Sequence, residues 1–412
     1  MRKTFCAQRG FSSLIIIGVI AISIFIGAFL FLKSNQPINV PGLRQSKEIP
    51  QNKRLILLQS QNKIKVFKSI DLSTKQKREL FRLGSDMVVN EAQVSPDGQK
   101  FYYIPSKSPD FPSNIVVFTN KGEKREFNLT KNDLWSLSSP GTLTGGMSKD
   151  CFWSLDGNKL ACMLIQRGSS RGAATGRDKI VVLDYTFGSI SEVFNSDQIG
   201  PPKGSAVLSV FGGWVDNNKL LYVQTQQNIV EIEPANFYTI DIKTGVVQKE
   251  FSYPYGGLGF KIAISPSKEE VFFQSFSRTQ EDKFIKYDMN SRQDTVLVST
   301  KDVLGTTHPV ISEDGSKLIF TTYLFLKSPQ EIDVLKPETL KGVGRSEIHL
   351  YDLTTNKEEI IRTPESIDYV EALLPDNKTF IVHKTPENSV IFDSETSSFE
   401  ELNGFFLGFG YF

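Results

Sequence analysis

Apolar and polar residues alternate in short runs along most of this chain. From Leu55 to the last residue, short apolar runs recur, and each ends in a polar turn rich in Asp, Asn, Gly and Ser. Successive side chains of a β-strand point to opposite faces of a sheet, so this pattern predicts many short strands joined by tight turns. The one long departure is the stretch from Leu14 to Leu32, in which no residue is charged.

The predicted strands form a repeat whose parts come in a fixed order. A turn of the Ser-Pro-Asp-Gly type, first seen at residues 95–98, is followed at once by an apolar strand. Related turns are at residues 154–157, 215–218, 265–268, 312–315 and 374–377. The spacings are 59, 60, 51, 47 and 62 residues when they are measured between the anchor residues Asp97, Asp156, Asp216, Ser267, Asp314 and Asp376. Repetition at about 40–60 residues, with several short strands in each unit, is typical of a β-propeller.

The second half of each repeat is a strand, a polar turn and another strand. Residues 180–184, 237–241, 285–288 and 348–353 are examples in which the first of these strands carries an Asp near its end. Together the two halves resemble the TolB-like β-propeller repeat, a relative of the WD repeat, over residues 55–412. This resemblance implies an all-β propeller fold. It implies no particular activity, because such propellers serve many functions.

Counting the parts of the repeat predicts seven blades. There are six turns of the first type but seven strand–turn–strand endings, so the opening unit, residues 55–83, lacks its innermost strand. Residues 404–412 are an apolar strand without a partner of its own, with Phe405, Leu407 and Phe409 expected on one face. Placed beside residues 55–59, this strand closes a ring of seven four-stranded blades and removes an exposed edge. A six-bladed ring with irregular ends is the alternative.

The N-terminal region predicts a membrane anchor. A helix over residues 14–32 nearly spans a hydrocarbon core of about 30 Å, and the basic leader, residues 1–13, contains Arg2, Lys3 and Arg9. The positive-inside rule therefore keeps the leader in the cytoplasm and places the propeller, residues 55–412, outside it at the cell membrane. Residues 33–54 are expected to be a flexible linker. A cleaved secretory signal is the competing interpretation, but its apolar core usually has only about 7–15 residues.

The leader also resembles the class III signal of type IV prepilins and pseudopilins. In that family a basic leader ends in Gly, cleavage occurs before a Phe, and an apolar stem follows; Gly10 and Phe11 occupy these two positions. The resemblance implies cleavage between them and a minor component associated with a pilus or with secretion. The chain departs from the family at Ile15, where pilins carry a Glu associated with subunit assembly. A plain signal anchor that contains Gly-Phe is the alternative.

Composition excludes several classes of protein. The 47 Lys and Arg against 46 Asp and Glu lack the basic excess of a nucleic-acid binder. Three Cys and three His do not favour a multi-ligand metal centre, and no Walker loop, dinucleotide fingerprint or calcium loop is present, so we expect no cofactor. A Gly-x-Ser-x-Gly motif is absent as well. His308, His349 and His383 are isolated and are interpreted as structural residues.

Long links between strands are the expected binding surface. They join the second and third strands of blades or connect one blade to the next, and in a propeller these two classes emerge on the same face. The expected long links are residues 105–114, 131–149, 166–179, 195–206, 225–236, 299–309 and 324–346. Arg167, Arg171 and Arg177 in one link have the chemistry to bind carboxylate or phosphate groups of a partner. The apolar residues of link 324–346 predict a short helix or a partner contact; solvated loops without a ligand are the alternative.

One hairpin places two cysteines opposite each other. If Asp156 and Gly157 form a two-residue turn, the numbers of opposing residues sum to 313, so Cys151 faces Cys162. This register predicts a hydrogen-bonded pair with Cα atoms about 5.5 Å apart, a separation that permits a disulfide outside the cytoplasm. Two buried free thiols are the alternative.

The sequence therefore predicts a membrane-anchored, extracytoplasmic β-propeller of bacterial type that acts as a non-enzymatic binding scaffold. Its expected contacts are the membrane, through one N-terminal helix, and a protein partner on the long-link side, with no nucleic acid. The first alternative is an enzyme that acts on a saccharide or peptide in the central channel. The second is the pilus- or secretion-associated component.

Overall fold

The structure is a computed structural model. It describes residues 53–412 except 63, 108–113, 131–134, 138–149, 167–176, 201–206, 227–233, 254–261, 266–268, 276–281, 301–302, 313, 326–343, 368, 375 and 386–387. The predicted leader, the Gly10–Phe11 junction and the predicted membrane helix lie outside these residues. No helix within the described residues has the length and apolar character needed to cross a membrane.

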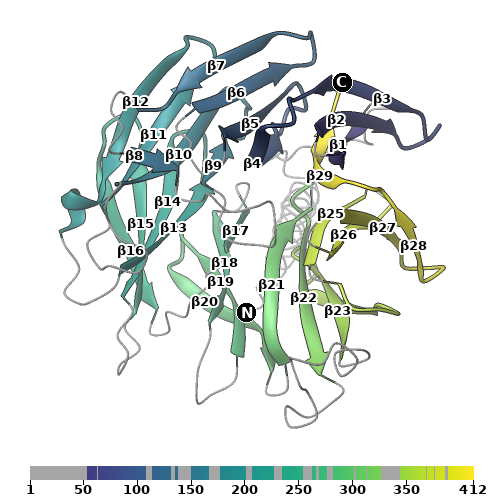
Figure 1. The fold of residues 1–412 in the computed structure, drawn as a ribbon. Helices are drawn as coiled ribbons and strands as arrows, with labels where there is room; N and C mark the ends of the chain where they lie inside the picture. Colours follow the sequence, from purple (N-terminus) through teal and green to yellow (C-terminus); the bar gives the residue numbers. More distant parts are fainter. Residues whose placement is uncertain are drawn as a thin grey trace, which may run out of the picture. The chain divides into compact units, whose positions relative to one another are not determined.

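Strands make up nearly all the regular structure of the described residues, and they form seven antiparallel sheets arranged in a ring (Figure 1). We name the sheets blades A to G in chain order. Blade A contains β29 (Phe405–Gly410), β1 (Arg54–Gln61), β2 (Ile64–Asp71) and β3 (Lys77–Arg82); blade B contains β4 (Met87–Val94), β5 (Lys100–Lys107), β6 (Asn114–Thr119) and β7 (Lys124–Asn128). Blade C contains β8 (Trp135–Leu137), β9 (Cys151–Trp153), β10 (Lys159–Gln166), β11 (Asp178–Asp184) and β12 (Ser189–Asn195); blade D contains β13 (Val207–Trp214), β14 (Lys219–Gln226), β15 (Ala235–Asp241) and β16 (Val247–Tyr253). Blade E contains β17 (Ile262–Ser265), β18 (Glu270–Ser275), β19 (Asp282–Asp288) and β20 (Gln293–Thr300). Blade F contains β21 (Val303–Ile311), β22 (Lys317–Phe325), β23 (Gly344–Asp352) and β24 (Lys357–Arg362); blade G contains β25 (Tyr369–Leu373), β26 (Thr379–Thr385), β27 (Asn388–Asp393) and β28 (Ser398–Glu401).

The strand named first in each blade above lies innermost, and in blade A this is β29. Contacts between neighbouring blades join β29 to β4, β9 to β13, β13 to β17, β17 to β21 and β21 to β25. The ring therefore has seven blades, as predicted, and the six-bladed alternative is wrong.

The C-terminal strand closes the ring as the inner strand of blade A. β29 pairs with β1 in an antiparallel register, with Leu55 opposite Phe409 and Leu58 opposite Phe405. The expected alternation of side chains along β29 is wrong at Phe409, because a register shift breaks the ladder at Leu407. Phe405 and Leu407 pack toward blade B, whereas Phe406 and Phe409 pack toward blade G. Gly408, at φ +139°, lies where an added Cβ would meet the Val94 Cβ at 2.8 Å, so the close approach of β29 to blade B requires glycine here.

The hydrophobic core is a series of layers between blades. Each of the seven buried clusters draws its side chains mainly from two neighbouring blades. Between blades A and B, for example, Phe67 stacks on Phe101 at 5.3 Å, and the C-terminal Phe412 packs on Phe101 at 5.2 Å. Because every blade must bury both faces, the ring is stable only when all neighbours are in place.

Two tryptophan side chains form hydrogen bonds between neighbouring blades. Trp153 Nε1 donates to the Gln93 carbonyl oxygen of blade B at 3.2 Å, and Trp214 Nε1 donates to the Phe152 carbonyl oxygen of blade C at 2.8 Å. The two indoles lie at the ends of β9 and β13, one repeat apart. One hydrogen bond thus joins blade C to blade B, and the other joins blade D to blade C, both between inner strands.

Two of the expected long links are shorter than predicted. Most of residues 299–309 belong to strands, because β20 ends at Thr300 and β21 begins at Val303. The link predicted at 131–149 contains β8, which pairs with the C-terminal end of β10. Both regions have few consecutive apolar residues, so the strand pattern was hidden in the sequence. The helix or contact predicted for link 324–346 lies largely outside the described residues.

Candidate functional site

The two faces of the ring differ in the length of their connections. One face, the short-turn face, carries turns such as residues 72–76 and 120–123. The opposite face, the long-link face, carries the links between second and third strands, which reach eighteen residues between β22 and β23. Long connections on a rigid scaffold are the usual location of binding residues.

Aspartates stabilise the short-turn face. Asp71 Oδ1 accepts hydrogen bonds from the backbone N–H groups of Ser73 and Thr74, both at 2.9 Å, and from the Ser73 hydroxyl at 2.6 Å. The Ser73 hydroxyl bond and the Thr74 backbone bond lower the pKa of Asp71 to about 2. Asp184, Asp241, Asp288, Asp352, Asp376 and Asp393 make the same pair of backbone bonds in their turns. These carboxylates therefore hold the turns by accepting hydrogen bonds from the backbone of the turn itself.

The ends of the propeller both lie on the short-turn face. Arg54, the first residue of β1, is opposite Asp71, which begins a short turn, and opposite Gly410. At the C-terminus, the Tyr411 N–H donates to the carbonyl oxygen of Gly98 in another short turn at 2.8 Å. The long-link face is therefore free of both ends of the propeller.

Blade C differs from the others in having its inner strand in two parts. β8 and β9 both pair with β10: Leu137 lies opposite Leu164, and Cys151 lies opposite Cys162. The Met163 N–H donates to the Asp150 carbonyl oxygen at 2.8 Å, which extends the second part by one residue. Leu137, where β8 ends, and Asp150, just before β9, therefore lie opposite Leu164 and Met163, which are adjacent residues of β10.

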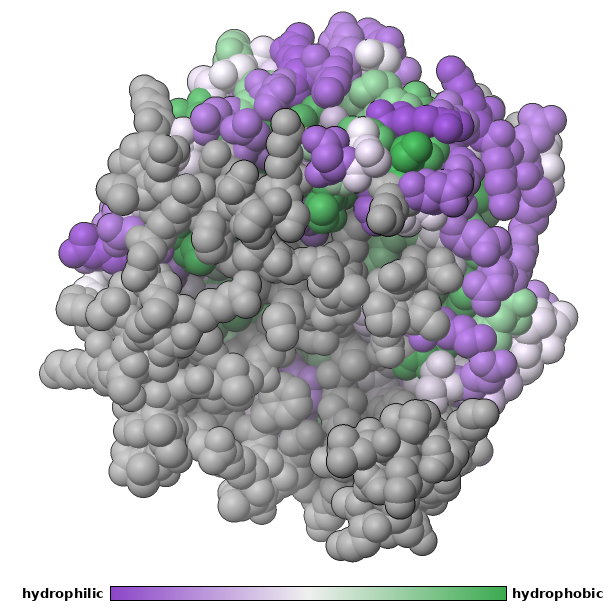
Figure 2. Space-filling view, viewed as in Figure 1, coloured by the Kyte–Doolittle hydropathy of each residue, from purple (hydrophilic) through white to green (hydrophobic). Residues whose placement is uncertain are grey.

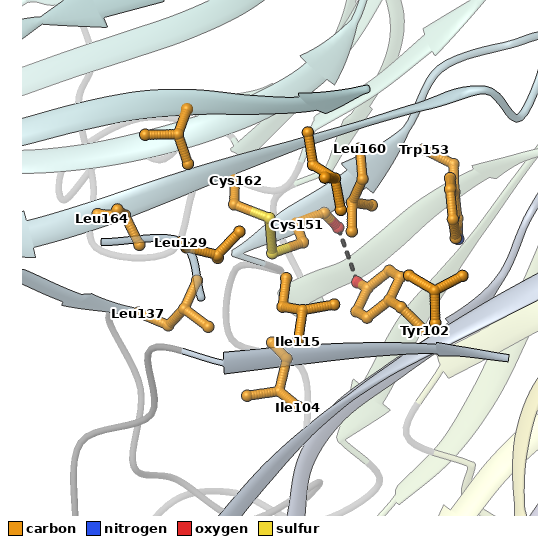
Figure 3. Close-up of a cluster of buried hydrophobic side chains, with 13 residues drawn as sticks. Tyr102, Ile104, Ile115, Leu129, Leu137, Cys151, Trp153, Leu160, Cys162 and Leu164 are labelled. Atoms are coloured by element: carbon orange, nitrogen blue, oxygen red, sulfur yellow. Dashed lines mark hydrogen bonds between the residues drawn. A yellow bond between two sulfur atoms is a disulfide. The ribbon is translucent and has the colours of Figure 1, made fainter. Parts of the chain in front are cut away.

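A disulfide joins Cys151 to Cys162 just after that connection (Figure 3). The opposition of the two residues confirms the predicted register, but their Cα atoms are 4.1 Å apart, not about 5.5 Å. The expected hydrogen-bonded pair is wrong. The Ser154 N–H donates to the Lys159 carbonyl oxygen, so the turn contains four residues and the ladder alternates in the opposite phase. Cys151 and Cys162 form a non-hydrogen-bonded pair, in which side chains lie closer.

A buried polar group lies beside the disulfide, between blades B and C. The Tyr102 hydroxyl contacts Glu91 Oε1. The same hydroxyl lies 2.9 Å from the carbonyl oxygen of Cys151 (Figure 3). Glu91 Oε2 accepts a hydrogen bond from the Asp150 N–H at 3.0 Å. Burial, followed by the charge of Glu91, raises the pKa of Tyr102 well above its usual value. These contacts fix Asp150 and Cys151, where the chain re-enters the inner strand.

A second buried polar group lies between blades C and D. Asp178 Oδ2 accepts a hydrogen bond from the Tyr222 hydroxyl at 3.1 Å, and Ser209 Oγ lies 2.7 Å from the same hydroxyl. Burial raises the pKa of Asp178 to about 6, although the hydroxyls of Ser209 and Tyr222 partly oppose that shift. Sequence reasoning missed both groups, because their members are separated by 11 to 59 residues along the chain.

Only one of the three candidate arginines lies within the described residues. Arg177, next to Asp178, forms an exposed ion pair with Asp197, with Nε 3.4 Å from Oδ1. Arg167 and Arg171 lie outside the described residues. The predicted arginine site therefore stays a prediction.

Blade F contains a hydroxyl–imidazole–carboxylate chain that the sequence did not indicate. His349 Nε2 lies 2.8 Å from Thr322 Oγ1, and His349 Nδ1 lies 2.7 Å from Glu358 Oε1. Hydrolases use this order of groups, but their hydroxyl must reach a substrate. Thr322 is only 2% exposed, and His349 stacks on Phe320 at 4.7 Å, so the chain is part of the core. Among the residues that the structure describes, no group of three or more His, Cys, Asp or Glu is placed to hold a metal ion.

Comparison with known proteins identifies the fold. No family model matches the sequence, and no curated protein matches it either. The chain is similar to an acylaminoacyl peptidase from Pyrococcus horikoshii, with a TM-score of 0.54 and 12% identity over 86% of this chain and 51% of that one. It is also similar to an uncharacterized protein from Listeria monocytogenes, with a TM-score of 0.50 and 12% identity over 87% and 95% of the two chains. A third similar structure is an oligogalacturonate lyase from Vibrio parahaemolyticus, with a TM-score of 0.50 and 11% identity over 79% of this chain and 87% of that one.

TolB proteins are also among the similar structures. The match to TolB from Acinetobacter baumannii has a TM-score of 0.42 and 12% identity, and the chain covers 64% of that protein, less than two thirds of its length. The chain spans about half of the peptidase. The prediction of a β-propeller is confirmed, with TolB proteins among its structural neighbours. The similar structures include a lyase and peptidases as well as TolB, so the similarity shows the fold but does not assign an activity.

Proposed function

We propose that this chain is a membrane-anchored, extracytoplasmic β-propeller that binds a protein partner through its long-link face. The observation that supports this proposal is the position of the two ends of the propeller. Arg54 and the Tyr411–Gly98 contact both lie on the short-turn face, so a tether that leads to Arg54 leaves the opposite face open to a partner.

Blade C is the proposed centre of that face. Its inner strand is held by the Cys151–Cys162 disulfide, and both of its sides carry buried tyrosine–carboxylate contacts. A rigid base lowers the entropy that a binding loop loses when a partner docks. The arginines of the link that ends at Arg177 would then present guanidinium groups to carboxylates or phosphates on the partner.

The N-terminal leader completes the proposal. The apolar stretch 14–32 would anchor the chain, and a prepilin-type peptidase would cut between Gly10 and Phe11. The absence of the pilin Glu at Ile15 argues against assembly into a filament, so we place the chain beside such a machine rather than within it. A channel enzyme is the alternative, and the buried position of Thr322 gives it no support.

Site-specific photo-crosslinking in membranes that carry the full-length chain tests the proposed face. A photoreactive residue would replace Asn62 or Arg177, which are exposed on the long-link face, with matched controls at Lys121 and Lys243 on the short-turn face. We expect adducts of discrete mass from the first pair and none from the controls. Adducts that form only from Lys121 or Lys243 would contradict the proposal.

A further inference from the structure

Charge is distributed unevenly around the ring. Residues 54–83, which form β1 to β3 of blade A, carry eight Lys or Arg and two Asp or Glu, a net charge of +6. Residues 363–412, which form blade G and the uncharged strand β29, carry two Lys and nine Asp or Glu, a net charge of −7. Blades A and G are neighbours in the ring, because the two ends of the chain meet there.

Both charges reach the outer rim of the ring. Lys77 and Arg78 of β3 are exposed, and so are Glu400 and Glu401 of β28. β3 and β28 lie on adjacent blades at one side of the ring, and hydrophilic side chains cover that side (Figures 1 and 2). Lys75 Nζ joins the two blades through Glu400 Oε2 at 2.8 Å. We call β3, β28 and the turns 72–76 and 394–397 the A–G rim.

The charges of the A–G rim are only partly neutralised within the chain. Arg82 pairs with Glu79, and Glu395 pairs with Lys378. Lys77, Arg78 and Glu401 make no ion pair within the described part of the chain. β3 and β28 are also the outer edges of their sheets, with one row of backbone groups facing outward. The rim therefore offers unpaired charges of both signs and unpaired backbone.

The arrangement of the two signs decides which partner fits. A uniformly anionic surface would attract blade A and repel blade G, and the two net charges almost cancel. Charges of opposite sign side by side are instead complementary to the same pattern turned by a two-fold axis. We propose that the A–G rim is a self-association surface, through which two copies of this chain pair with blade A of each against blade G of the other.

Such an interface has a clear physical signature. Exposed ion pairs are individually weak and are screened over about 8 Å at physiological salt, so the association is weak and falls as salt rises. Anchoring two copies in one membrane raises their effective concentration and favours the pair. This inference does not depend on the partner proposed for the long-link face.

Charge-reversal variants of the full-length chain in detergent test the proposal. One variant carries Lys77→Glu and Arg78→Glu; the other carries Glu395→Lys and Glu401→Lys, which leaves the Lys75–Glu400 pair intact. Analytical ultracentrifugation at low salt should show that each variant associates with a dissociation constant at least about tenfold higher than that of the unmodified chain. The matched control, Lys243→Glu with Lys249→Glu on the rim of blade D, should associate as the unmodified chain does.

Mixing separates this proposal from simple damage to the fold. When the two variants are mixed, both contacts between unlike copies become attractive, so heterodimers should form at low salt and dissociate at high salt. A chain that stays monomeric at all concentrations, or a mixture that forms no heterodimer, overturns the proposal. An effect confined to Lys77→Glu with Arg78→Glu, and seen only when anionic lipid is added to the micelles, would also overturn it and assign the rim to a lipid surface.

Discussion

At the scale of single residues, Asp178 is a buried carboxyl group whose proton affinity depends on the fold. Its pKa is about 6 in the folded protein and about 3.9 in an unfolded chain, so the folded state binds the proton more tightly. Its contribution to stability is present below about pH 4 and is lost as the pH rises through 6. At neutral pH the buried charge therefore costs stability.

We expect Asp178→Asn to remove this pH dependence, because the amide oxygen still accepts the Tyr222 hydroxyl but carries no charge. Relative to the unmodified chain, the free energy of unfolding should rise by about 3 kcal/mol at pH 7.5 but by only about 1 kcal/mol at pH 4.5. Urea unfolding across this range checks the difference. The exposed neighbour Asp197→Asn is the control, and equal pH profiles for Asp178→Asn and the unmodified chain would argue against the buried charge.

The Cys151–Cys162 bond is a second prediction at this scale. Both residues are fully buried, so in the folded protein they should resist alkylation until the chain is unfolded and reduced. Intact mass spectrometry without reductant should show a mass two hydrogens lower than that of the thiol form. Two alkylatable thiols at these positions in the unfolded, unreduced chain would reject the bond.

The residues of the candidate site show where sequence reasoning stops. The facing of Cys151 and Cys162 followed from the turn, because register carries along a hairpin. The spacing of their Cα atoms did not, because a Ser-x-Asp-Gly turn does not reveal whether two or four residues lie outside the ladder. The contacts of Tyr102 with Glu91 and of Tyr222 with Asp178 join different strands or blades, so no local pattern predicts them.

At the scale of elements, β29 decides whether the ring is closed. Deletion of residues 403–412 removes its pairing with β1 and exposes buried groups of blades B and G, such as Val94 and Ile381. We expect an aggregating, protease-sensitive product, checked by size-exclusion chromatography and limited proteolysis. Gly408→Val is the matched point variant: its Cβ would collide with Val94, so it should lower the free energy of unfolding by more than about 2 kcal/mol. A deletion variant that melts like the unmodified chain would show that β29 does not hold the ring.

Elements were predicted more reliably than the details within them. The repeat of turns and apolar strands was enough for the seven blades and for the closing role of residues 404–412. Register shifts were not predictable, because one extra residue leaves the apolar pattern nearly unchanged, as at Leu407. The split inner strand of blade C was missed for a similar reason, since Trp135–Leu137 is too short to show a period.

At the scale of the whole molecule, the property to test is the membrane topology of the chain. The basic residues Arg2, Lys3 and Arg9 should hold the leader in the cytoplasm, so a reporter that works only outside the cytoplasm should be active after Phe412. A flexible linker must precede the reporter, because Phe412 is 8% exposed and packs between blades. Activity of a cytoplasmic reporter at that position would reverse the assignment. N-terminal sequencing of the mature chain should begin at Phe11, and an intact leader would remove the prepilin-like interpretation.

The pairing of β1 with β29 also sets the order of events during biosynthesis. The first strand to be synthesised in the propeller waits for the last one, about 350 residues later, before its inner edge is covered. Closing so long a loop is entropically costly and slows the final folding step. Until then the chain is an open arc with uncovered apolar strands, and any prematurely terminated copy is exposed to proteases. Ring closure is thus the last step in the folding of the propeller.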